Sequence, residues 1–157
     1  MVFMQSDVPS LKQQLHTLCL AFVQRRLAGA EEAIREAQLS ANEETKSSAG
    51  DKYETGRAMA QLEIEKNTFQ RAESLKLKQA LDQIEHAEKA LSVQRGSLVH
   101  TSQGSFYIAI SAGQFIIRNK TYFAISPASP IGQKLIGLGP KGSFIFSGKT
   151  FLIETIE

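Results

Sequence analysis

The stretch Leu11–Ala41, LKQQLHTLCLAFVQRRLAGAEEAIREAQLSA, decides the fold of the first half of the chain. Its apolar residues recur at spacings of three and four, which is the period of an α-helix. They are Leu11, Leu15, Leu18, Phe22, Val23, Leu27, Ala30, Ile34, Ala37 and Ala41. Because Gly29 alone interrupts the stretch and proline is absent, we predict one long amphipathic helix of about 31 residues.

The residues that follow this helix break its pattern. Asn42 to Asp51 carry no large apolar side chain, and they end in the step Gly50-Asp51. Polar residues with a glycine between two periodic segments indicate a turn. We therefore predict a polar, acidic tip at about residues 42–56.

A second apolar stripe begins after the turn. Its members are Met59, Leu62, Phe69, Leu77, Leu81, Ile84 and Leu91, and neither glycine nor proline occurs between Ala58 and Ala90. This favours a second helix of about 40 residues. Two long helices joined by a short polar turn bury their stripes by folding back on each other, so residues 1–94 are predicted to form an antiparallel coiled-coil hairpin. Such a hairpin satisfies its own apolar faces, and we expect a monomer.

After Arg95-Gly96 the helical period gives way to short β-branched and aromatic runs. These runs read as strands at 97–101, 106–110, 115–117, 121–125, 143–146 and 150–156, separated by turn residues. One short helix interrupts them, with Ser129 as its N-cap, Pro130 in its first position and Gly137 just past its end. Residues 95–157 are predicted to form a small antiparallel β-sheet domain with one short helix, and the fold class is α+β.

Composition excludes several classes of function. The net charge is only +2 and both signs are interleaved, which argues against a protein that coats nucleic acid. Cys19 is the sole cysteine and lies among apolar residues, so we interpret it as a buried structural thiol. The histidines at 16, 86 and 100 show no metal-ligand spacing. The sequence offers no membrane span and no secretory signal, and we expect a cytoplasmic protein.

One string in the second domain resembles a known family. The run Ile125-Ser126-Pro127-Ala128-Ser129-Pro130-Ile131-Gly132-Gln133-Lys134-Leu135-Ile136-Gly137, followed by Gly142, is similar to the C-terminal signature of the Gre family of bacterial transcription elongation factors. Arg95-Gly96-Ser97-Leu98-Val99 resembles the first strand of the same domain. The resemblance implies an FKBP-like domain that docks on RNA polymerase, with Pro130 and Ile131 as candidate contact residues.

The resemblance extends to the turn of the hairpin. The family carries an acidic motif, G-D-x-x-E-N, between its two helices, and this chain reads Gly50-Asp51-Lys52-Tyr53-Glu54-Thr55. The glycine and both carboxylates keep their separation, whereas Thr55 replaces the usual Asn. The resemblance implies that Asp51 and Glu54 are the catalytic and metal-binding residues, holding a Mg²⁺ that is shared with the polymerase. Lys52 and Arg57 are candidates for contact with RNA or polymerase.

The implied activity belongs to a complex and not to this chain alone. A factor of this family enters the secondary channel of RNA polymerase and stimulates cleavage of the RNA 3′ end in a backtracked complex. Two metal ions then clamp the attacking and leaving oxygens of the phosphodiester. We therefore expect a chain that is no enzyme by itself and that stimulates the intrinsic nuclease of the polymerase.

Three alternatives remain open at this stage. The pair Asp51 and Glu54 also fits a capping box, with Asp51 as N-cap and Glu54 at the third helical position. The chain could be a non-catalytic regulator of the same fold that binds RNA polymerase without promoting cleavage, since the tip departs from the family at Thr55. It could also be a coiled-coil adaptor for another protein.

Overall fold

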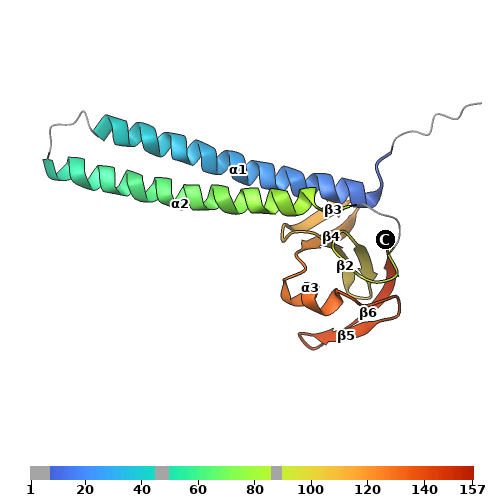
Figure 1. Ribbon diagram of the computed structural model, residues 1–157. Coiled ribbons are helices and arrows are strands. Elements are labelled where there is room, and N and C mark those ends of the chain that lie inside the picture. Colours follow the sequence, from blue (N-terminus) through green and yellow to red (C-terminus); the bar gives the residue numbers. More distant parts are fainter. Residues whose placement is uncertain (1–7, 45–49, 86–89) are drawn as a thin grey trace, which may run out of the picture. The chain divides into compact units, whose positions relative to one another are not determined.

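A computed structural model of the chain describes residues 8–44, 50–85 and 90–157, and leaves the side chains of residues 44 and 51–53 undescribed (Figure 1). The chain divides into two compact units. One consists of Ala21–Gln79, and the other combines the chain up to Leu20 with Ala80–Glu157. Two long helices, a six-stranded sheet and a short helix confirm the predicted α+β class. Among the described residues, no helix is long and apolar enough to span a bilayer.

The first unit is the greater part of a hairpin of two helices, whose residues 11–20 and 80–82 belong to the second unit. Helix α1 (Leu11–Glu44) has 34 residues and helix α2 (Gly50–Asp82) has 33, and they run side by side in Figure 1. The predicted stripe of α1 is confirmed, because Val23 and Ala30 are buried. An ion pair joins the two helices, in which Arg71 Nε donates to Glu31 Oε1 over 3.2 Å.

The predicted stripe of α2 is wrong over most of its length. Met59, Leu62 and Phe69 are 63 to 65 % exposed. The buried positions are Ala60, Ser74 and Leu81, which are separated by multiples of seven residues and so share one position of a heptad. Small Ala and Ser side chains allow the two backbones to approach closely, and the larger apolar residues are left on the outer faces. Ser74 is tolerated inside because its hydroxyl donates to the carbonyl of Gln70.

The end of α2 also differs from the prediction. The helix ends at Asp82 instead of continuing to about Ala90, and Leu91 is 92 % exposed. Ile84 closes a turn by donating its N–H to the carbonyl of Leu81. The chain leaves the helix here because Val93 is buried in the core of the second unit and bonds through its N–H to the carbonyl of Leu138. His86 lies outside the described residues.

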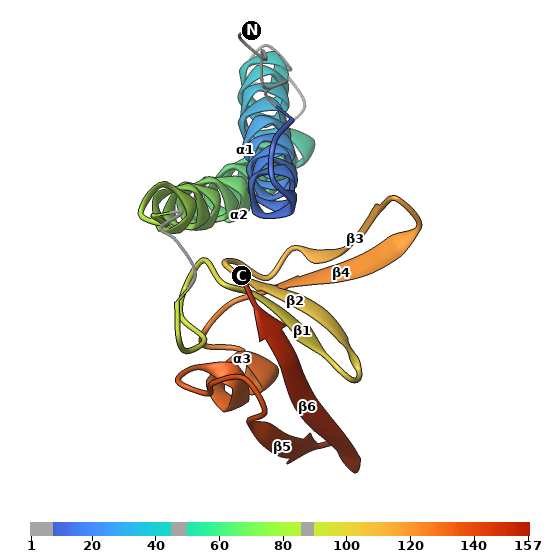
Figure 2. The same ribbon diagram turned by 90° about the vertical axis from the view of Figure 1, so that its right-hand side faces the viewer.

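The second unit is built on six strands. They are β1 (Leu98–Thr101), β2 (Gly104–Ile108), β3 (Gly113–Ile117), β4 (Lys120–Ile125), β5 (Ser143–Phe146) and β6 (Lys149–Ile156). The order is β3-β4-β2-β1-β6-β5, so the predicted antiparallel meander is wrong (Figure 2). The strand β2 pairs with β4 in parallel instead of with β3, and β1 pairs with β6. A physical reason is burial. The buried strand β2 needs a neighbour on both sides, whereas the more exposed β3 can occupy an edge.

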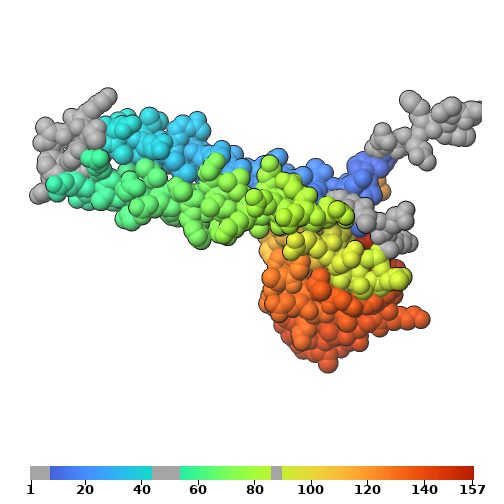
Figure 3. Space-filling model, in the orientation of Figure 1, coloured from blue at the N-terminus to red at the C-terminus, as the bar shows by residue number. Residues whose placement is uncertain are grey.

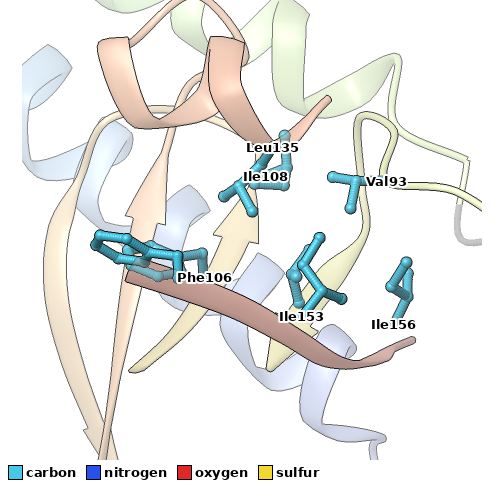
Figure 4. Close-up of a cluster of buried hydrophobic side chains, with 8 residues drawn as sticks. Val93, Phe106, Ile108, Leu135, Ile153 and Ile156 are labelled. Atoms are coloured by element: carbon cyan, nitrogen blue, oxygen red, sulfur yellow. The ribbon is translucent and has the colours of Figure 1, made fainter. Parts of the chain in front are cut away.

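Helix α3 (Pro130–Leu135) closes the core against one face of this sheet. Leu135 is fully buried with residues from the strands and with Val93 (Figure 4). The aromatic residues predicted for the core contribute to differing degrees. Phe106, Tyr122 and Phe151 are buried, Phe123, Phe144 and Phe146 pack against the cluster from partly buried positions, and Phe115 is half-buried.

Candidate functional site

The acidic tip lies at the start of α2. The helix begins at Gly50, so Asp51 is its second residue and position 54 follows within the next turn. Positions three apart on a helix are neighbours on its surface. The side chains of Asp51 and Lys52 lie outside the described residues, as does the connection at 45–49. The backbone therefore brings the two predicted carboxylate positions to one end of the hairpin.

Two further predicted residues of the tip are described in full. Glu54 and Arg57 are both exposed. Together with Ala58 and Gln61 they line an open hollow of about 440 Å³ on the first turns of α2. Figure 3 shows the described start of α2 in teal. A carboxylate in the first turn of a helix is also favoured by the helix dipole. The capping-box alternative stays open, because the side chain of Asp51 lies outside the described residues.

The chemistry of the tip limits how it could hold a metal ion. No group of three or more His, Cys, Asp or Glu side chains with metal-binding geometry occurs among the described residues. Positions 51 and 54 supply two carboxylates. Mg²⁺ commonly binds through one or two carboxylates and keeps several waters. A pair of carboxylates therefore fits an ion whose remaining ligands are waters or groups of another molecule.

The string that carries the family resemblance folds as the entry to α3. Ser129 is the N-cap, and its hydroxyl accepts from the N–H of Gly132 over 3.1 Å and donates to the carbonyl of Ser126 over 2.7 Å. A Cβ atom on Gly132 would overlap the carbonyl oxygen of Ser126. Gly137, with φ of +88°, follows the end of the helix as predicted. Serine, proline and glycine each meet a geometric need at their place in this string.

The two predicted polymerase contacts in this string differ in exposure. Pro130 is exposed at the first helical position. Ile131 is half-buried and packs against the core cluster. Pro130 therefore offers surface to a partner, whereas a substitution of Ile131 also disturbs the core.

Two polar clusters in the second unit were not predicted from the sequence. His16 Nδ1 lies 3.0 Å from the hydroxyl of Tyr107, whose side chain is fully buried. His100 lies between Ser105 and Glu157, with Nδ1 2.8 Å from Ser105 Oγ and Nε2 2.6 Å from Glu157 Oε2. A signal was available for the second cluster. His100 and Ser105 flank a tight turn, and residues opposite each other in a hairpin share one face.

The cluster around His100 stabilises the pairing of the strands. His100 and Ser105 are direct partners in the β1–β2 ladder, and the backbone of Glu157 exchanges two hydrogen bonds with Leu98. The side-chain contacts therefore reinforce backbone pairing that fastens the C-terminal residue to β1.

Cys19 is fully buried, as predicted. Burial raises the pKa of its thiol to about 12. Because the thiolate is the reactive form, this cysteine is unreactive at neutral pH in the folded chain.

Comparison with known proteins adds no family to this picture. No protein-family model matches the chain, and no curated protein matches it. The resemblance to the Gre family therefore rests on the quoted residues alone.

Proposed function

We propose that this chain is a transcription elongation factor that inserts its helical hairpin into the secondary channel of RNA polymerase and stimulates Mg²⁺-dependent cleavage of backtracked RNA. Asp51 and Glu54 would hold a Mg²⁺ ion together with groups of the polymerase, and this ion would supply the charge stabilisation that phosphodiester hydrolysis needs. The second unit docks on the polymerase near the channel mouth, with Pro130 among its contacts.

The observation that carries this proposal is the hairpin with its acidic end. Helix α2 has 33 residues, which corresponds to about 50 Å at 1.5 Å per residue. The small buried residues Ala60 and Ser74 favour a close approach of the two helices, and the proposal requires a slender hairpin. The carboxylate positions 51 and 54 stand at the end that would arrive first. Within the family-like string, the structure gives Ser129, Pro130 and Gly132 structural roles at the start of α3.

The second candidate is a regulator that occupies the same channel without promoting cleavage. The non-catalytic regulator is favoured by three residues that replace those usual at the tip of the cleavage factors, namely Thr55, Gly56 and Arg57. The two candidates share polymerase binding and differ only in chemistry. A coiled-coil adaptor for another protein would share neither property.

A transcript-cleavage assay separates these candidates. RNA polymerase is stalled in a backtracked complex, and this protein and Mg²⁺ are added while the length of end-labelled RNA is followed. A cleavage factor accelerates the release of 3′ fragments, and a non-catalytic regulator binds and does not. An adaptor fails to bind the polymerase at all, which would overturn the proposal.

The tip residues are tested in the same assay. Asp51→Asn and Glu54→Gln keep the shape of each side chain and remove its charge, so both should abolish stimulation while binding remains. The matched control is Glu43→Gln with Glu44→Gln, which neutralises two carboxylates at the end of α1 and should leave stimulation intact. Equal loss in the control would mean that general acidity of the tip matters, and not the two proposed ligands.

A further inference from the structure

The free edge of the sheet in the second unit lies beside a groove. Strand β3 is the first strand in the sheet order, so it has a strand neighbour on only one side among the described residues. The hairpin to β4 closes through a two-residue turn at Arg118 and Asn119, both with positive φ. In such a hairpin the closing pair, Ile117 and Lys120, is hydrogen-bonded, and pairing alternates from there. The backbone groups of Gln114 and Ile116 therefore face away from β4.

The groove is formed by two adjoining cavities of about 300 and about 400 Å³. Pro9, Gln14 and Ile117 line both, so the cavities are continuous between the start of α1 and the edge of β3. We call this surface the β3 groove. Its floor is apolar, with Leu11 and Tyr122 in one cavity and Leu18 in the other. Figure 2 shows the β3–β4 hairpin extending beside the first turns of α1.

Contacts within the same unit hold both walls of the groove. The hydrogen bond between His16 and Tyr107 fastens the first turns of α1 to β2. Ser10 and Gln13 cap the start of α1 reciprocally, with Ser10 N–H donating to Gln13 Oε1 and Gln13 N–H donating to Ser10 Oγ. The groove is therefore a preformed surface.

Charge and exposure indicate what kind of segment the groove accepts. Arg118 and Lys120 line one cavity and are exposed, and among the residues from Val8 onward that the structure describes, no carboxylate lines either cavity. No ion pair joins either cation to a carboxylate among the described residues. Ile116, at 68 % exposure, is a large apolar residue left in solvent on the same edge. An unpaired edge with exposed apolar residues is a template for another strand.

We infer that the β3 groove binds an extended acidic peptide segment of a partner protein, which pairs its backbone with Gln114 and Ile116. Alternate side chains of the segment enter the apolar groove, and its carboxylates meet Arg118 and Lys120. This is strand addition, in which backbone hydrogen bonds supply affinity and side-chain pockets supply specificity. A second copy of the chain fits less well, because β3 carries no acidic residue to meet the two cations. The inference is independent of the proposed function at the hairpin tip.

The test uses the full chain and a defined probe. The probe is a fluorescent peptide of about eight residues in which Glu alternates with Val, blocked at both ends, and binding is followed by fluorescence anisotropy. A second peptide has Lys in place of Glu. We expect the acidic peptide to bind at least about tenfold more tightly than the basic one, with a difference that shrinks in high salt.

Charge-reversal variants test the two cations. The double variant Arg118→Glu with Lys120→Glu should lower the affinity for the acidic peptide at least about tenfold and raise the affinity for the basic peptide. The reason is that the reversed charges repel Glu and attract Lys. Lys120→Glu alone serves if the double variant folds poorly. The matched control is Lys134→Glu with Lys149→Glu, which reverses two exposed charges elsewhere in the same unit and should leave both affinities within about twofold.

Backbone pairing is tested at Ile116. Ile116→Pro removes an N–H that faces away from β4, so the ladder to β4 keeps its bonds while strand addition loses one. Ile116→Thr keeps the N–H and serves as the control. Binding should be weaker in the proline variant than in the threonine variant. The inference is overturned if the two variants bind alike, if charge reversal has no effect, or if the chain dimerises through this edge and excludes the acidic peptide.

Discussion

The imidazole Nδ1 of His16 lies 3.0 Å from the phenolic oxygen of Tyr107, and this hydrogen bond joins the start of α1 to the centre of the sheet. The two rings meet edge to face, with centroids 6.5 Å apart. Tyr107 is fully buried. Because a buried hydroxyl without a partner is costly, the pair fixes where the first turns of α1 lie against β2.

A double-mutant cycle measures this hydrogen bond. Tyr107→Phe should lower the free energy of unfolding by about 1–3 kcal/mol, since it removes the hydroxyl and leaves the ring. The cycle is completed with His16→Ala and the double variant, and urea unfolding gives each value. A coupling energy of about 0.5–1.5 kcal/mol is expected, and strict additivity would show that the two groups act separately.

Stability should fall in alkaline solution. Burial raises the pKa of Cys19 from 9.0 to about 12. The pKa of Tyr107 is raised as well, first by burial and then by the neighbouring charge of Cys19. Between about pH 9 and 12 the folded chain therefore binds more protons than the unfolded chain, so the free energy of unfolding falls as pH rises. Below that window the stabilisation is fully present.

Urea midpoints at about pH 8 and about pH 10.5 check this dependence. Cys19→Ala should reduce the difference between the two midpoints, because the titrating thiol is gone. If Cys19→Ala shows the same difference as the unaltered chain, ionisation of this thiol contributes nothing to the alkaline loss.

Two glycine substitutions should change the free energy of unfolding in opposite directions. Gly132→Ala brings a Cβ against the carbonyl of Ser126 and should cost about 1–3 kcal/mol through overpacking at the start of α3. Gly29→Ala lies in α1, where nothing approaches within 4 Å, and should stabilise the helix by about 0.5–1 kcal/mol. Thermal unfolding of both variants checks the prediction, and a stabilising Gly132→Ala would contradict the described packing of α3.

The two faces of α2 should respond differently to substitution. Leu62 is 64 % exposed, so Leu62→Gln should change the free energy of unfolding by no more than about 0.5 kcal/mol. Leu81 is fully buried, and Leu81→Ala should cost about 2–5 kcal/mol. Urea unfolding of the two variants distinguishes the faces. A large loss in the free energy of unfolding for Leu62→Gln would contradict the described packing and support the buried face that the sequence predicted.

Sequence periodicity predicted the elements of this chain better than their partners. Local patterns predicted the start of α1 at Leu11, the six strands, the N-cap of α3 at Ser129 and the glycine just past its end at Gly137. The inner face of α2 did not, because close helix packing selects the small residues Ala60 and Ser74 and leaves larger apolar residues outside. Local apolarity says nothing about which face meets the neighbouring helix.

Long-range pairing was likewise beyond a single sequence. The parallel pairing of β2 with β4 and the meeting of His16 with Tyr107 join residues 17 or more positions apart. Neither contact produces a repeating pattern of residues in the sequence. For the candidate site, the sequence located Asp51 and Glu54 near a turn, and the fold places both positions at the start of α2.

The central claim is that the hairpin tip stimulates RNA cleavage, and the most direct measurement is the rate of 3′ fragment release from a backtracked RNA polymerase complex. The unaltered chain with Mg²⁺ is predicted to accelerate release. The variant with Asp51→Asn and Glu54→Gln is predicted to lose at least about tenfold of that acceleration while it binds the polymerase equally well. No acceleration by the unaltered chain, or full acceleration by the variant, would contradict the claim.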